Sequence, residues 1–330
     1  MTGSTWCCGT SKKREAALFR YLLSRLLATL PVILVVAVLV FLLLRLSPGD
    51  PAAIIAGDNA TSEQIERIRA GLGLDRPLVV QFALWSKKLL RGDLGESFYF
   101  KKTVTELIGQ RLEPTVALAL GTMLLAVLIA VPLGMVAAFR HGGWLDRALM
   151  GFATLGFSIP VFVLGYVLMW LFSLKLGWLP VQGYTRLSEG LLPFARHMLL
   201  PWVTLSVIYS PLIARVTRAA VSEALTEDFV RTARAKGLPE WRVLFAHALP
   251  NSAVPIVTVI GVGLGLLLGG VVVTESVYSI PGLGRLTVEA VLARDFPTIQ
   301  GLILLFSVTY VLLNLLIDLS YPLLDPRIRY

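Results

Sequence analysis

The sequence predicts an all-α integral membrane protein with six transmembrane helices and both termini in the cytoplasm. Apolar residues make up 56% of the 330-residue chain and charged residues only 15%, against roughly 25% charged residues in an ordinary soluble domain. Six stretches contain no Asp, Glu, Lys or Arg over a length that can cross a hydrocarbon core, which takes about 17 to 25 residues. Apolar and polar residues do not alternate in them as they do in barrel strands, so each stretch predicts a helix.

The six apolar stretches follow one another along the chain, and the fourth is the shortest. They are Leu26–Leu44, Pro114–Phe139, Ala148–Leu174, His197–Ala214, Ala248–Thr274 and Phe296–Ile317. The first is longer than the roughly 7–15 residues of a signal-peptide core, and no A-x-A cleavage site follows it. We therefore expect a retained first transmembrane helix within 18–46. It follows a cytoplasmic N-terminal tail, 1–17, that carries Cys7 and Cys8.

The distribution of Lys and Arg sets the predicted orientation. With both termini inside, the inner and the outer segments each hold 15 of the 30 basic residues. Ten of the outer 15 lie between Arg45 and Arg111, in a loop too long to follow the positive-inside rule well. The remaining segments are short, and they hold 15 basic residues inside against five outside. The net charge of +9 is thus explained by membrane topology, and we expect no nucleic-acid partner.

The first external loop, 47–112, is too long for a bare connection and predicts a small helical subdomain. Thr61 can cap a helix that Gly71 ends, and a second amphipathic segment runs from Pro77 to Leu89.

The transmembrane core that follows spans 113–325, and a short cytoplasmic C-terminus, 326–330, completes the chain. Within the fifth stretch, Gly261, Gly265 and Gly269 recur at every fourth position. This spacing leaves one helix face without side chains and predicts close packing of another helix. A dinucleotide-binding loop is the alternative, but the GxGxxG spacing is not met and no strand precedes it.

An ionisable residue near the membrane warrants a functional hypothesis. Glu275 lies at the outer end of the fifth stretch, beside an external turn, 279–284, that contains Pro281, Gly282 and Gly284. Glu275 is either an ordinary interfacial residue or faces a substrate that carries an amino group. The turn and Glu275 are therefore a candidate substrate pathway or external gate.

The inside loop over 215–250 mixes polar and apolar residues at helical spacing. Two short helices are expected to meet near Gly237, and Val230 and Ala233 share one face of the first. A thin basic helix beside a turn that can act as a hinge suits docking into a cleft on another protein. An interfacial helix held by anionic lipid is the alternative.

The sequence lacks the residues that several kinds of catalytic and binding site require. None of the eight lysines follows a glycine, so no Walker A loop exists and the chain has no ATPase site of that type. The three histidines are isolated, which makes a metal site improbable on sequence grounds. Ser158 matches a loose motif of intramembrane serine proteases, but His197 and His247 lie at segment edges, where they do not serve a serine nucleophile. We expect a transport subunit rather than an enzyme, with the protease as the non-transport alternative.

The loop over 215–250 also carries a family signature. Permeases of bacterial importers share a loop with Glu-Ala-Ala, three residues, Gly, nine residues and Ile-x-Leu-Pro. Here the Gly is Gly237, the second Ala is Ala233, and Arg231 stands where the family has Glu. The matching residues are Arg231, Thr232, Ala233, Arg234, Ala235, Lys236, Gly237, Leu238, His247, Leu249 and Pro250. Further family-like strings occur in order at 48–51, 71–77, 92–95, 281–284 and 324–327.

On these residues the chain resembles permease subunits of bacterial ABC importers for dipeptides, oligopeptides, glutathione and nickel, over about 18–330. The resemblance implies a type I importer permease fold in the bacterial inner membrane. It implies four kinds of partner: the lipid bilayer, a second homologous permease, two cytoplasmic ATPases that bind ATP and Mg, and an external solute-binding protein. It also implies that 215–250 is a coupling loop lying in a groove on one ATPase, and it favours peptide as substrate, with glutathione, a nickel chelate or another small solute as alternatives.

Overall fold

The computed structural model describes residues 27–43, 45, 52–53, 61–71, 73 and 75–324. The predicted segments that lie outside the described residues are the tail with Cys7 and Cys8, the string at 48–51, all but the first residue of the string at 324–327, and the C-terminus, 326–330. The part of the chain that is described is nearly all helical, and its strand-like pairing is a single isolated bridge between Glu96 and Thr103.

The first described helix, Leu27–Leu43, is followed by two helices in the predicted external loop and then by the main bundle. The elements are α3 (Ser62–Gly71), α4 (Leu78–Leu89), α5 (Val104–Phe139), α6 (Trp144–Ser158), α7 (Val161–Leu168), η1 (Met169–Lys175), η2 (Leu187–Glu189), α8 (Leu191–Ala224), α9 (Asp228–Ala235), α10 (Glu240–Arg242), η3 (Val243–Ala248), α11 (Leu249–Asn251), α12 (Ala253–Val277), α13 (Leu283–Leu292) and α14 (Phe296–Leu324).

Three of these helices are each long and apolar enough to cross a membrane: Val104–Phe139, Leu191–Ala224 and Phe296–Pro322. A fourth candidate is a pair, Glu240–Asn251 and Ala253–Gly269, that bends by 65° at its break. Two further apolar helices, Leu27–Leu43 and Val161–Lys175, are shorter. Every predicted apolar stretch therefore contains helix, while the count of six passes stays a prediction.

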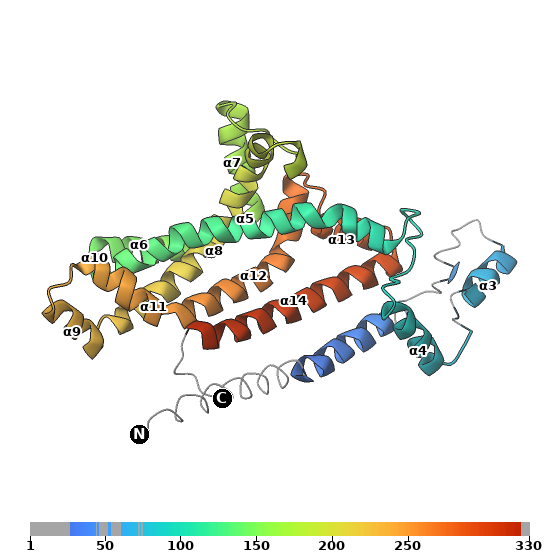
Figure 1. Ribbon diagram of the computed structural model, residues 1–330. Coiled ribbons are helices and arrows are strands. Elements are labelled where there is room, and N and C mark those ends of the chain that lie inside the picture. The colour runs from blue at the N-terminus through green and yellow to red at the C-terminus, as the bar shows by residue number, and fades with distance from the viewer. Residues whose placement is uncertain are drawn as a thin grey trace, which may run out of the picture.

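The third apolar stretch, Ala148–Leu174, is not one helix, and here the prediction is wrong. Helix α6 ends at Ser158, Ile159 is extended (φ −92°, ψ 120°), and α7 begins after Pro160. A residue before proline is pushed out of the helical region by the proline ring, which explains the break. Figure 1 shows α7 projecting away from the layer formed by α5, α12 and α14.

Helices α5 and α8 form the centre of the bundle. Small buried residues recur at every fourth position of α5, at Thr122, Ala126, Ala130 and Gly134, so α8 can approach closely. A Cβ atom on Gly134 would lie 2.7 Å from the carbonyl oxygen of Ala214 in α8. Because that neighbour is backbone, the close approach requires glycine.

The bundle has two distinct ends. Figure 1 shows α9, α10 and α11 together at one end and α13 with α4 at the other. Helix α5 begins at Val104, so the predicted boundary between external loop and core, at 112/113, lies inside a helix. In the external subdomain, Thr61 Oγ1 accepts from the Gln64 amide (3.3 Å) and Gln64 Oε1 from the Thr61 amide (2.9 Å). This reciprocal cap explains the start of α3, as predicted.

Candidate functional site

The predicted coupling loop, 215–250, begins inside α8, which runs to Ala224, so its predicted start is wrong. Beyond α8, short helices on either side of a glycine turn follow, as the pattern predicts. Helix α9 ends at Ala235, and Gly237 follows with a φ of +77°, a left-handed conformation that favours glycine. Pro239 then precedes α10. The chain continues through η3 and α11 and bends by 65° into the following helix, α12. A displacement of the turn would therefore act on the end of a helix of the main bundle.

A small apolar core holds the loop together. Val230 and Ala233 of α9 pack against Val243 of η3, and Leu238 lies partly buried beside them. Ala248 contacts the inner ends of α5 and α8 in a neighbouring cluster. The loop is thus a packed unit attached to the bundle.

The opposite face of α9 is exposed and charged. Arg231 pairs with Asp228 at 3.4 Å, and its side chain is 76% exposed. Arg234 forms two hydrogen bonds with the carboxylate of Glu240, at 3.0 and 3.1 Å, which tie α9 to α10 across the turn. Of the remaining signature residues, Thr232, Ala235, Lys236 and Pro250 are exposed, while His247 and Leu249 are partly buried.

Two exposed aromatic residues extend this face. Trp241 is 60% and Phe245 57% exposed. Exposed aromatic residues beside basic residues are typical of protein interfaces, and neither Trp241 nor Phe245 belongs to the family signature. Their position one helical turn apart, directly after Pro239, is the signal that could have identified them.

A second contact that sequence reasoning missed joins the first turn of α6 to α8. Arg218 forms a two-point ion pair with Asp146, through Nε and through Nη2, the latter at 2.7 Å from Oδ2. The Asp146 carboxylate is 6% exposed. The Arg218 guanidinium holds the pKa of Asp146 below its usual value, chiefly by this hydrogen bond. A buried pair of this kind fixes the inner end of α8 next to the coupling loop.

At the other end of the bundle, the external turn closes around Glu275. This residue is fully buried. Its carboxylate accepts from the Thr115 hydroxyl at 2.6 Å and from the Arg285 amide at 2.9 Å. The Thr115 hydroxyl oxygen in turn accepts from the Leu283 amide at 2.7 Å. Glu275 therefore anchors the start of α13 to α5, and contact with a substrate would require this turn to open.

The glycines of the turn make room for that carboxylate. A Cβ atom on Gly282 would overlap the carboxyl group of Glu275, and one on Gly284 would lie 2.6 Å from the backbone of Val272. Pro281 precedes both and is exposed. The turn residues and Glu275 thus form one tightly packed arrangement.

The three glycines of the fifth stretch have different surroundings. A Cβ atom on Gly261 would overlap Ile317 of α14, and one on Gly265 would lie 2.7 Å from the Tyr310 ring. A Cβ atom on Gly269 would meet nothing within 4 Å. Gly261 and Gly265 lie against α14, and Gly265 and Gly269 both line an open groove.

Comparison with known proteins gives matches along nearly the whole chain. A family model described as a binding-protein-dependent transport system inner membrane component matches residues 130–330, and the model of the family's N-terminal region matches residues 18–119. A probable peptide ABC transporter permease protein of Sinorhizobium fredii is 51% identical over 94% of this chain and 99% of its own length.

Two further relatives and one solved structure agree with this pattern. A putative peptide transport system permease protein of Brucella abortus is 43% identical over 94% of this chain and 98% of its own. The glutathione transport system permease protein GsiC of Salmonella typhi is 44% identical over 95% of this chain and all of its own. A chain of the inward-facing MetNI methionine ABC transporter aligns with a TM-score of 0.57 at 18% identity, over 67% of this chain and 97% of that chain.

Proposed function

The chain belongs to the family of binding-protein-dependent transport system inner membrane components, and from this membership we propose that it forms part of a path that carries peptides into the cell. It is the multi-pass permease subunit of an ABC importer in the inner membrane, and the ATPase is a separate subunit. Importers of this family also include a second permease and a binding protein. Two ATPases, with ATP and Mg bound to them, would complete the assembly.

The observation that carries the peptide proposal is the 51% identity, over 94% of the chain, to a relative named as a probable peptide permease. Glutathione is the second candidate, because a relative at 44% identity is named for its transport. Glutathione is itself a small peptide, so the two candidates share the same general chemistry and differ in side chains and linkage.

The coupling loop is the part of the chain best suited to receive motion from an ATPase. It is a packed unit with an exposed basic and aromatic face, and it bends directly into α12. Closure of the ATPases on ATP would pull this unit and tilt α12, so that the bundle alternates between inward-open and outward-open states. Arg231 stands where the family has Glu, so the charge at this position is reversed. An ATPase partner would therefore offer an acidic or neutral side chain to it.

Transport assays with the complete importer test the substrate. The chain is reconstituted in proteoliposomes with its own second permease, ATPases and binding protein. ATP-dependent uptake of labelled dipeptides and tripeptides is then compared with that of glutathione and of nickel. We expect peptide uptake that unlabelled peptides compete away. Uptake of glutathione or nickel without any peptide uptake would overturn the peptide proposal.

A further inference from the structure

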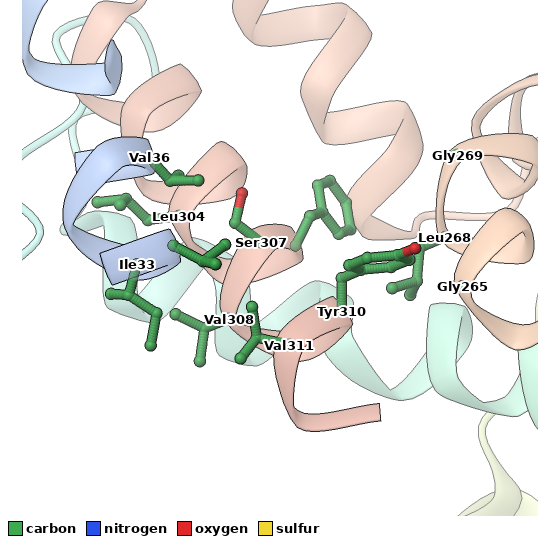
Figure 2. A pocket seen from close by; sticks show the side chains of 12 residues that line it. Ile33, Val36, Gly265, Leu268, Gly269, Leu304, Ser307, Val308, Tyr310 and Val311 are labelled. Carbon is green, nitrogen blue, oxygen red and sulfur yellow. The ribbon is translucent and has the colours of Figure 1, made fainter. Parts of the chain in front are cut away.

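Two hollows lie along the first helix, and neither belongs to the coupling loop or the external turn. The basic pocket, about 680 Å³, opens where Arg45 meets α4, the segment 91–98 and the start of α14. The apolar groove, about 330 Å³, lies further along the same helix, between it, α12 and α14 (Figure 2). Both hollows therefore share the first helix and α14 as walls.

The basic pocket has an excess of positive charge. Five of its lining residues are basic and two are acidic. Within the part of the chain that the structure describes, none of the five basic residues forms an ion pair. The basic residues are Arg45, Arg76, Lys87, Lys88 and Arg91, and the acidic ones are Asp93 and Glu96. An anion would neutralise this excess.

The Arg45 side chain is held in the pocket by hydrogen bonds. Its guanidinium donates to Gln81 Oε1 at 3.1 and 3.0 Å and to the carbonyl of Phe41 at 3.0 Å. Both acceptors are neutral, so these bonds orient the partly buried cation without balancing its charge. Gln81 is itself held, because its amide donates to the carbonyl of Arg76 at 2.8 Å. A partly buried cation is stabilised by a counter-ion, and the pocket is shaped to admit one.

The surroundings place this pocket at the edge of the membrane. Arg45 follows directly on the apolar first helix, whose Leu39 is 61% exposed. Phe41 packs with Phe82 and Trp85 at ring centroid distances of 5.2 and 5.7 Å. Tryptophan, here Trp85, is enriched at the level of lipid headgroups. The apolar groove beside the same helix favours a lipid phosphate over an acidic side chain of the binding protein as the anion here.

The apolar groove lies further along the same two helices than the basic pocket. Gln300 of α14 lines the basic pocket, and Leu304, one helical turn on, lines the groove. Val36 lines the groove from the first helix, nine positions before Arg45, which is about 13 Å along a helix. Figure 2 shows the apolar side chains of both helices around this space. Ala37 packs on Leu304 between the two hollows, so an acyl chain would pass over this contact.

We propose that an anionic phospholipid binds here, with its phosphate in the basic pocket and one acyl chain in the apolar groove. The lipid fastens the first helix and the external subdomain to α14. This role is independent of the transported substrate.

Native mass spectrometry of the complete importer tests the headgroup site. The complex is purified and offered phosphatidylglycerol or zwitterionic phosphatidylcholine. Lys88→Gln with Arg91→Gln removes two pocket charges that form no described ion pair, so folding survives. Lys101→Gln with Arg186→Gln removes two exposed charges outside the pocket and is the matched control. We expect about a fivefold loss of retained phosphatidylglycerol in the pocket variant only. Equal retention in both variants would overturn the proposal.

A second pair of variants separates a lipid from a free phosphate. Gly269→Leu fills the groove at a position with nothing within 4 Å, and Gly151→Leu makes the same change at an equally open site on α6. We expect Gly269→Leu alone to lower phosphatidylglycerol retention, while weak competition by inorganic phosphate persists. If inorganic phosphate displaces the lipid fully and Gly269→Leu has no effect, the site binds a free anion and the proposal is wrong. If the pocket variant keeps its lipid but loses docking of the binding protein, the surface is a protein interface and the proposal is also wrong.

Discussion

For Glu275, the sequence leaves open a contact with substrate, whereas the structure shows a buried carboxylate. A carboxylate that binds a substrate amine needs an oxygen that no protein group occupies. Here both oxygens of Glu275 accept hydrogen bonds from protein donors, including the Thr115 hydroxyl at 2.6 Å. Thr115→Val leaves the charge intact and removes one donor, so we expect a loss of about 1–3 kcal/mol in stability.

Glu275→Gln should destabilise the turn similarly, because its amide group would face backbone donors. Thermal unfolding and uptake are measured on the purified importer. Slower uptake of Glu275→Gln at wild-type stability would instead favour the substrate contact.

The pair of Asp146 and Arg218 predicts a pH dependence. The pKa of Asp146 is lower in the folded chain than in the unfolded one, because the Arg218 guanidinium binds the ionised form. The pair therefore stabilises the fold above the usual carboxyl pKa, and that stability is lost as the pH falls through the lowered value. Asp146→Asn leaves a largely buried arginine unpaired and should cost about 3–5 kcal/mol at pH 7.

The matched control for that change is Asp228→Asn, since Asp228 is 95% exposed in its pair with Arg231. A surface pair contributes less than about 1 kcal/mol. Unfolding of the importer from pH 7 down to about pH 2 should show an acid-dependent decrease in stability that is smaller in Asp146→Asn than in the wild type and unchanged in Asp228→Asn. Identical curves for all three proteins would contradict a stabilising role for the buried pair.

Among the elements, the turn between α9 and α10 carries the coupling hypothesis. Gly237 has a φ of +77° and Gly177, in the segment after η1, a φ of +65°, and neither has a neighbour within 4 Å of an added Cβ atom. Valine at either position costs about 1–2 kcal/mol of backbone strain without a clash. We expect Gly237→Val to raise the ATP hydrolysed per peptide imported severalfold or to weaken assembly, and Gly177→Val to do neither. Normal coupling in both variants would rule out a coupling role for this turn.

Helix periodicity predicts some elements well because it determines which face of a helix is apolar. Val230 and Ala233 share a face in the sequence and are buried in the structure. The break before Pro160 was missed because the prediction considered the apolar composition of the stretch and not the effect of its proline on the helix. The contact of Glu275 with Thr115 spans 160 positions, and it depends on how α5 and α12 are rotated against each other. The rotation of one helix against another cannot be derived from a single sequence, so buried polar pairs of this kind were not predictable.

For the whole molecule, the long helix pair α5 and α8 sets the direction of the bundle. The coupling loop and the external turn lie at its opposite ends (Figure 1). Buried small residues along α5 bring α8 close, so we expect the pair to transmit movement from one end to the other. This arrangement is what an importer needs if ATPases act on one side and a binding protein on the other.

The sidedness of that arrangement is the prediction on which the function depends. The basic residues of the short segments favour the cytoplasm for the coupling loop. With Cys7 and Cys8 replaced by serine, single cysteines are introduced by Lys236→Cys in the loop and by Leu90→Cys, at a position 88% exposed near the opposite end. A membrane-impermeant maleimide should label Leu90→Cys in intact spheroplasts. It should label Lys236→Cys only after the membrane is opened, and less when the ATPases are assembled. Labelling of Lys236→Cys from outside would reverse the orientation, and the coupling loop could then not contact a cytoplasmic ATPase.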